Sequence, residues 1–169
     1  MLNFKNKFKA NISDESFKYT SNSILRVLTD LDDKLIAFTS SSNECSYYDT
    51  LKKIFETLKL TEDKICVIYS YINSSEPNIK EVGYGHFVAE NLKPDEFRKL
   101  VDECKKQFDK IFVVVPTVIV YADALEYVKI CANVILVEKY MRSKYLKYEN
   151  TLDVLKNVGI NICGVIARK

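Results

Sequence analysis

The side chains that most often carry chemistry are few and scattered in this chain. His86 is the only histidine, and no cysteine or carboxylate accompanies it at the spacing of a metal site. The five cysteines are widely spaced and include no CxxC pair: Cys45, Cys66, Cys104, Cys131 and Cys163. No Ser-His-Asp or Cys-His arrangement is evident. These patterns predict reduced thiols in a cytoplasmic protein, with neither a bound metal nor a catalytic triad.

One stretch has the position of a phosphate-binding loop but not its residues. The sequence "TSSSNECSYYDT" (Thr39–Thr50) follows the apolar run "KLIAF" and precedes the helical pattern "LKKIFETLKL". Such a loop binds phosphate when glycines let backbone N–H groups surround the anion and a lysine neutralises it. This stretch contains neither glycine nor lysine. It is therefore a lost nucleotide site, a loop with another role, or an ordinary turn.

The elements around this loop predict an α/β fold, because short β-branched runs alternate with longer helical patterns. Strands are expected at 34–39, 64–72, 111–115, 134–138 and 161–167. Helices are expected at 14–28, 48–58, 94–107, 123–131 and 143–157, and 73–93 is expected to be a loop. The strands show no polar alternation, which is typical of a mostly parallel sheet covered on both faces. We expect a three-layer α/β/α sandwich, with residues 1–169 as one domain and residues 1–13 as a flexible basic terminus.

Composition narrows the possible partners. The chain has 25 Lys and Arg residues against 23 Asp and Glu residues, and its net charge of +2 is too small to indicate nucleic acid. No apolar run approaches the ~20 residues that a membrane-spanning helix needs. In a parallel sheet, ligands bind outside the carboxyl ends of the strands. Function is therefore expected in the segments that follow the strands: 39–50, 69–75, 116–123, 138–148 and 168–169.

Read together, these segments resemble the bacterial tyrosine kinases of capsule and exopolysaccharide synthesis, which belong to the same P-loop class as the MinD and ParA ATPases. The resemblance is clearest in "FDKIFVVVPTVIVYADALEYVKICANVILVEKY" and "TLDVLKNVGINICGVIARK". Near the front, "ESFKYTSNSI" resembles the family's "EAYRTLRTNI" helix, and "KLIAFTSSS" its first strand. The resemblance implies a P-loop NTPase-like fold.

The family's functional motifs are absent from this framework. Its loop resembles "TSxxPGEGKST", which places Glu44 and Ser46 on the two glycines. Tyr47 then falls on the lysine and Tyr48 on the magnesium-binding Ser or Thr. A glutamate and two phenols in these positions would repel or block a triphosphate.

The acidic positions of the family are replaced as well. Tyr69 and Tyr71 fall on the two aspartates of the second strand, and Val114 on that of the third. Arg168 stands where the family has an asparagine of the kind that recognises the adenine base. The resemblance therefore implies a P-loop fold whose nucleotide site is degenerate, with no cofactor expected.

The replacing tyrosines allow two interpretations. Tyr47, Tyr48, Tyr69 and Tyr71 should gather at one edge of the sheet, either filling the vacated nucleotide cavity or presenting a surface to a partner. A second aromatic and basic segment contributes to the candidate partner surface through three further residues, Tyr140, Arg142 and Tyr145.

The leading hypothesis is a catalytically inactive, tyrosine kinase-like pseudoenzyme that acts as a protein-binding or regulatory module. By analogy with the family, its partner would be a membrane adaptor of polysaccharide export or an active paralogue, which would bring this cytoplasmic chain to the membrane. A homodimer is compatible with this reading. The alternatives are an active but atypical ATP-binding autokinase or ATPase, and an unrelated flavodoxin-like or receiver-like domain.

Overall fold

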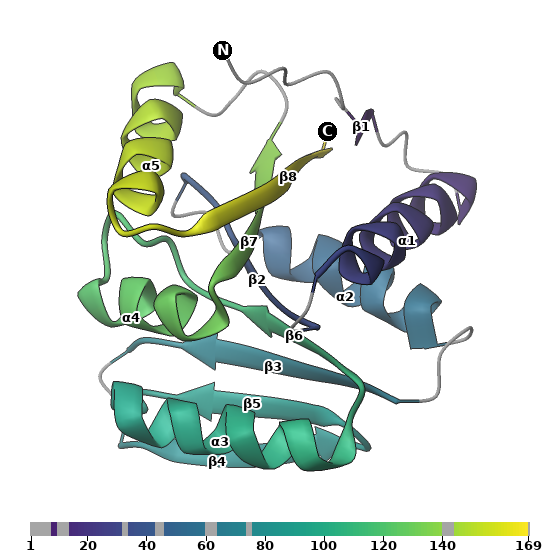
Figure 1. Ribbon diagram of the computed structural model, residues 1–169, viewed down its shortest axis with the longest axis vertical. Helices are drawn as coiled ribbons and strands as arrows, with labels where there is room; N and C mark the ends of the chain where they lie inside the picture. The colour runs from purple at the N-terminus through teal and green to yellow at the C-terminus, as the bar shows by residue number, and fades with distance from the viewer. Residues whose placement is uncertain are drawn as a thin grey trace.

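The computed structural model describes residues 8–9, 14–31, 34–42, 46–59, 64–73, 76–139 and 144–168. Within these ranges one eight-stranded sheet has the order β1-β8-β7-β2-β6-β3-β5-β4 (Figure 1). Neighbouring strands are parallel except β4 and β5, which are antiparallel. The predicted mostly parallel α/β sheet is confirmed. The strands are β1 (Phe8–Lys9), β2 (Leu35–Thr39), β3 (Ile65–Tyr71), β4 (Asn78–Gly83), β5 (His86–Glu90), β6 (Lys110–Val114), β7 (Asn133–Lys139) and β8 (Asn161–Arg168).

The central position of β2 distinguishes this sheet from a flavodoxin-like one. Leu35 is paired with Ile111 of β6 on one side, and Ala37 is paired with Val134 of β7 on the other. Strand β3, which follows β2 in the chain, lies beyond β6. In flavodoxin-like and receiver-like sheets the first strand lies instead between the second and the third. The strand order therefore argues against that alternative.

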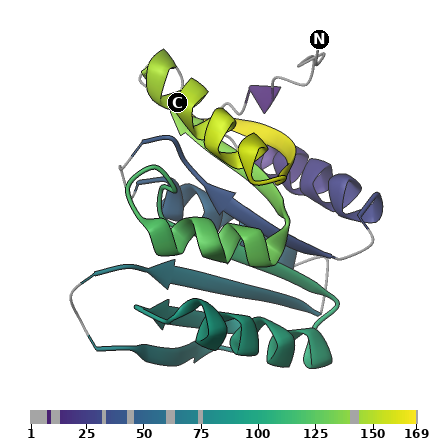
Figure 2. The same ribbon diagram turned by 60° about the vertical axis from the view of Figure 1, so that its left-hand side comes forward.

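Helices cover both faces of the sheet and form the two outer layers (Figures 1 and 2). Two of them pack on one face and three on the other, each layer enclosing its own hydrophobic core. The first layer consists of α1 (Asp14–Thr29) and α2 (Ser46–Lys59), and the second of α3 (Pro94–Gln107), α4 (Ala122–Cys131) and α5 (Tyr145–Asn157). None of these helices is long and apolar enough to cross a membrane.

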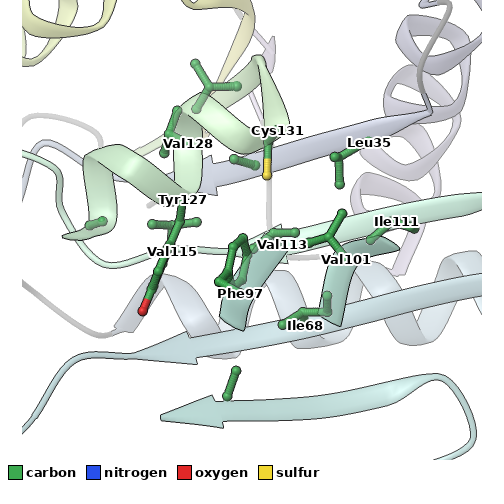
Figure 3. Packing of buried hydrophobic residues seen from close by; sticks show 14 of the residues in the cluster. Leu35, Ile68, Phe97, Val101, Ile111, Val113, Val115, Tyr127, Val128 and Cys131 are labelled. Carbon is green, nitrogen blue, oxygen red and sulfur yellow. The ribbon is translucent and has the colours of Figure 1, made fainter. Parts of the chain in front are cut away.

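Successive residues of the central strands enter opposite cores, which explains why the strands have no polar face. In β3, Val67 packs in the α1–α2 layer, whereas Cys66 and Ile68 pack in the layer of α3, α4 and α5. In the latter layer, Phe97 of α3 stacks on Tyr127 of α4 with ring centroids 4.2 Å apart (Figure 3). This packing fixes the strands whose carboxyl ends form the candidate site.

The segment 73–93 was predicted to be a loop, and this prediction is wrong, because it contains the β4–β5 hairpin. The two strands are joined by a turn at Tyr84 and Gly85. Gly85 has a φ of +68°, and a Cβ there would lie 2.7 Å from the carbonyl oxygen of Ile65, so the turn requires glycine. All six residues of β4 are exposed. The sequence therefore lacked the apolar alternation that identifies a strand.

The N-terminal strand β1 was not predicted either. It is parallel to β8, with Phe8 paired with Ile166. Residues 1–7 and 10–13 of the expected flexible terminus lie outside the described residues.

Candidate functional site

The candidate site lies where β2, β6, β3 and β7 end, beside the start of α2 (Figure 1). Tyr47 and Tyr48 occupy the first turn of α2. They continue the apolar face that Leu51, Phe55 and Leu58 present to the sheet. The rings of both tyrosines therefore lie over the strand ends and not in solvent, with exposed fractions of 2% and 9%.

The hydroxyls of both tyrosines are bonded to strand-end carbonyls. Tyr47 Oη donates to the carbonyl oxygen of Val115, just after β6, at 2.6 Å. Tyr48 Oη donates to the carbonyl oxygen of Ser70 in β3 at 2.7 Å. The first turn of α2 is thus attached to two neighbouring strands through buried phenols.

Two shorter side chains satisfy the neighbouring carbonyls. Ser70 Oγ donates to the carbonyl oxygen of Val114 at 2.7 Å, and Thr39 Oγ1 donates to that of Pro116 at 2.9 Å. Together with the tyrosine bonds, these contacts occupy four carbonyls at the ends of β3 and β6. At the carboxyl ends of these two strands, the chain's own side chains therefore occupy the carbonyl oxygens that a ligand could otherwise bind.

The second pair of tyrosines extends the aromatic cluster along β3. Tyr71 stacks on Tyr48 with centroids 5.1 Å apart, and the rings of Tyr69 and Tyr48 are 6.3 Å apart. The Tyr69 hydroxyl is buried and has no hydrogen-bond partner among the described residues. Burial raises its pKa far above the usual value, and nearby Tyr71 and Glu56 raise it further. Tyr69 is therefore a neutral phenol and cannot replace a metal-binding carboxylate.

A buried carboxylate holds the beginning of the β2–α2 loop. Glu138, near the end of β7, accepts hydrogen bonds from Ser41 N and Ser41 Oγ, both at 2.7 Å. Its exposed fraction is only 7%. In a phosphate-binding loop, backbone N–H groups point at the anion. Here a loop N–H points at a carboxylate of the same chain, which would repel a phosphate placed beside it.

Sequence reasoning placed Glu138 in a candidate segment but gave it no role. The available signal was weak: one acidic residue at the end of the apolar run 134–137. A charged residue in such a position is seldom buried without a partner. Its partner, Ser41, is distant in sequence and becomes a neighbour only because β2 pairs with β7.

The structure brings some of the predicted site residues together and separates others. Tyr47, Tyr48, Tyr69 and Tyr71 come together, and the Val114 side chain is fully buried in the same core. Arg168 is buried at the end of β8, opposite Lys139 of β7. Glu44, Tyr140 and Arg142 lie outside the described residues, and Ser46 begins α2.

One part of the partner-surface prediction does not fit the structure. Tyr47, Tyr48 and Tyr69 are at least nine-tenths buried, so they offer little area to a partner. The alternative interpretation, that these rings fill the interior, agrees with their hydrogen bonds and ring contacts. Tyr71 is half-buried. Tyr145 is 74% exposed and begins α5, on the opposite face of the sheet.

Comparison with known proteins identifies solved structures that share this fold. No protein-family model and no curated protein matches the chain. Among solved structures, the kinase domain of the Escherichia coli tyrosine kinase Etk is similar, with a TM-score of 0.68 and 16% identity over 91% of this chain and 74% of that one. The BceF tyrosine kinase domain gives 0.72 and 10% over 90% and 76%. The chain has the fold of the bacterial tyrosine kinase domains.

A solved structure of a ParA family ATPase is similar as well. A ParA family ATPase from Chlorobium tepidum TLS gives a TM-score of 0.60 and 8% identity over 81% of this chain and 73% of that one. The predicted resemblance to tyrosine kinases and ParA-like P-loop proteins is thus confirmed as a likeness of fold. The assignment of individual residues to positions of the kinase motifs stays a prediction.

Phosphoryl transfer has well-defined chemical requirements. That reaction relies on a lysine, a magnesium ion and its carboxylate ligands. The described residues contain no group of three or more His, Cys, Asp or Glu side chains that could hold a metal ion. At the ends of β3 and β6 the hydrogen-bonding side chains are phenols and hydroxyls, the Glu138 carboxylate of β7 is bonded to Ser41, and Lys139 and Arg168 lie at the ends of β7 and β8. This arrangement is suited to holding the α2 start and the loop in place.

Proposed function

We propose that this chain is a pseudoenzyme: a tyrosine kinase-like P-loop fold that does not transfer phosphoryl groups and acts as a protein-binding or regulatory module. The observation that carries the proposal is the buried Tyr47 ring, whose hydroxyl donates to Val115. In the alignment proposed from the sequence, Tyr47 takes the position of the phosphate-binding lysine. A buried, hydrogen-bonded phenol in that position supplies no positive charge and fills the space that a triphosphate needs.

The Glu138 carboxylate supports the proposal independently of the tyrosines. It bonds both the N–H and the hydroxyl of Ser41 in the loop where the family binds phosphate. Two negative charges 4 Å apart repel by roughly 1–4 kcal/mol at effective dielectric constants of about 80 to 20. A nucleotide phosphate would have to displace this carboxylate or bind beside it.

The partner and the pathway form the finer part of the proposal. By analogy with the tyrosine kinases of polysaccharide synthesis, we propose that the chain acts in capsule or exopolysaccharide production. Its partner would be a membrane adaptor of polysaccharide export or an active paralogue, and its location would be cytoplasmic. The net charge of +2 gives no support to nucleic acid as a partner.

Thermal unfolding with and without Mg-ATP tests the loss of nucleotide binding. A ligand at 100 times its Kd adds about 2.7 kcal/mol of stability, which for a domain of this size raises Tm by about 5–11 °C. We expect no shift for this chain, whereas the Etk kinase domain serves as the positive control. A clear stabilisation that Tyr47→Ala abolishes would show that the chain binds nucleotide and would favour the alternative of an active, atypical enzyme. An incubation with radiolabelled ATP then reports whether any tyrosine of the chain becomes phosphorylated.

A further inference from the structure

Two exposed apolar surfaces of opposite charge lie on this molecule, and neither belongs to the closed site. The first, here called the hairpin surface, consists of Glu76, Ile79, Glu81, Val82 and Tyr84 on β4 and around it. The second, here called the α5 surface, consists of four residues at the start of α5, Lys144, Tyr145, Leu146 and Lys147. Scattered exposed apolar residues are common, but clusters flanked by charges mark interaction sites more often.

The hairpin surface is apolar and acidic. Ile79, Val82 and Tyr84 are 47%, 55% and 72% exposed, and Glu76 and Glu81 are exposed as well. Ile79 and Glu81 are opposite Ala89 and Phe87 of β5, so they point to the face that α3 covers. Tyr84 points the same way, because its ring lies 5.6 Å from that of Phe108. The intervening Lys80 points to the other face, since successive residues of a strand alternate. Val82 does not follow this alternation, because it lies at the register shift between Glu81 and Gly83.

The α5 surface is apolar and basic. Tyr145 and Leu146 are 74% and 67% exposed, and Lys144 and Lys147 flank them in solvent. Helices α2, α3 and α4 each carry an acidic residue in the first turn, but α5 carries none. Lysines near the positive end of a helix are unfavourable unless a negative charge approaches from outside. Glu149 accepts a hydrogen bond from the Tyr145 hydroxyl and keeps its negative charge, so two lysines face one carboxylate and the start of α5 stays basic.

The two surfaces lie at opposite ends of the sheet. β4 is the last strand at one end, and α5 packs on β8 near the other end. Both views show the hairpin and α5 on opposite sides of the molecule (Figures 1 and 2). One chain therefore cannot join its own two surfaces, whereas two copies can, with the hairpin of one against the α5 start of the next.

Symmetric contacts between like surfaces are disfavoured. Two antiparallel β4 strands related by a two-fold axis centred on the strand would pair Lys80 with Lys80, or Glu81 with Glu81, of the other copy. Like charges directly opposite each other destabilise a strand pair. Two α5 surfaces would likewise set lysines against lysines. Each surface thus repels its own kind and attracts the other.

We propose that the hairpin surface of one copy binds the α5 surface of the next, so that copies of this chain associate head to tail. Glu76 and Glu81 would meet Lys144 and Lys147, while Ile79, Val82 and Tyr84 would cover Tyr145 and Leu146. Such contacts use two different patches, so they propagate into open chains or close into rings. The inference names a partner for the protein-binding role proposed above, but it does not depend on whether the chain binds nucleotide.

Complementary charge reversals test the proposal without a known ligand. Variant A, K144E/K147E, has two acidic surfaces, and variant B, E76K/E81K, has two basic ones. Sedimentation velocity without nucleotide should show the wild-type chain associating as its concentration rises. The association should weaken between about 50 mM and about 500 mM NaCl, because salt screens exposed charges. Variants A and B alone should sediment as monomers, and their equimolar mixture should associate again, because each acidic surface then finds a basic one.

The equimolar mixture of variants A and B distinguishes association through opposite charges from a loss of folding. All four substituted positions are exposed, and circular dichroism confirms that each variant is folded before it is mixed. A wild-type chain that stays monomeric at all concentrations, or a mixture that stays monomeric, overturns the proposal. So does association of A or B alone at the wild-type level. A chain that associates in this way and also becomes phosphorylated in Mg-ATP would refute the pseudoenzyme proposal and leave this one intact.

Discussion

Removal of the Tyr47 hydroxyl oxygen tests whether the hydrogen bond from the start of α2 to the end of β6 forms in solution. In Tyr47→Phe the ring stays, but the Val115 carbonyl loses the donor that now lies 2.6 Å away. Tyr47 is 2% exposed, so water cannot replace the lost bond. A buried polar group left without a partner costs about 1–3 kcal/mol. We therefore expect Tyr47→Phe to lower the free energy of unfolding by about 1–2 kcal/mol, the lower part of that range, because the ring packing is retained.

Urea denaturation followed by far-ultraviolet circular dichroism measures this change, and it suits a chain without tryptophan. With a denaturant slope of about 2 kcal/mol/M, the midpoint should fall by about 0.5–1 M. Tyr145→Phe is the matched control, because it removes the same atom from a side chain that is 74% exposed. Its midpoint should fall much less, because water can replace the hydrogen bond that Glu149 loses. If the two variants unfold at the same urea concentration, the Tyr47 hydroxyl does not satisfy the carbonyl. The argument for a filled nucleotide site then fails.

Three further predictions follow from buried contacts elsewhere. Glu138→Ala leaves the Ser41 N–H unpaired and should lower the free energy of unfolding by about 1.5–3 kcal/mol in a urea titration, with Glu138→Gln less affected. Equal stability of Glu138→Ala and the wild type would show that the Ser41–Glu138 bonds do not hold the loop. Gly85→Ala places a Cβ 2.7 Å from a backbone oxygen at a φ of +68° and should lower Tm, while Gly83→Ala, with nothing within 4 Å, should not. Burial raises the pKa of Tyr127 to about 12, so the folded state keeps a proton that the unfolded state loses near pH 10. Stability should therefore fall as pH rises from 10 to 12, by up to about 1.4 kcal/mol per pH unit, and a Tyr127→Phe variant with the same decline would refute this assignment.

The main fold was predictable because its signals are local. Buried parallel strands have continuous apolar runs, and the helices between them carry capping and termination signals that can be read over a few residues. Strand β6 and helix α3, which begins at Pro94, were found within a residue of their observed bounds. Strand β4 was missed because its residues are exposed, and β1 because two residues carry no periodic signal.

The candidate site was predictable only in part, because its contacts join distant segments. The gathering of Tyr47, Tyr48, Tyr69 and Tyr71 followed from the parallel sheet, which brings the carboxyl ends of neighbouring strands together. Whether the rings point inward depended on packing, which residue types alone do not determine. The bond from Ser41 to Glu138 crosses between β2 and β7 and has no sequence pattern of its own.

The side-chain closure of four strand-end carbonyls has an evolutionary consequence. Thr39, Tyr47, Tyr48 and Ser70 each donate to a different carbonyl, so replacing any one of them leaves a buried acceptor without its donor. A lysine at position 47 would leave the Val115 carbonyl without its donor and empty the volume of a buried ring. Substitutions at these four positions are thus selected against one by one, which makes this part of the interior resistant to gradual change.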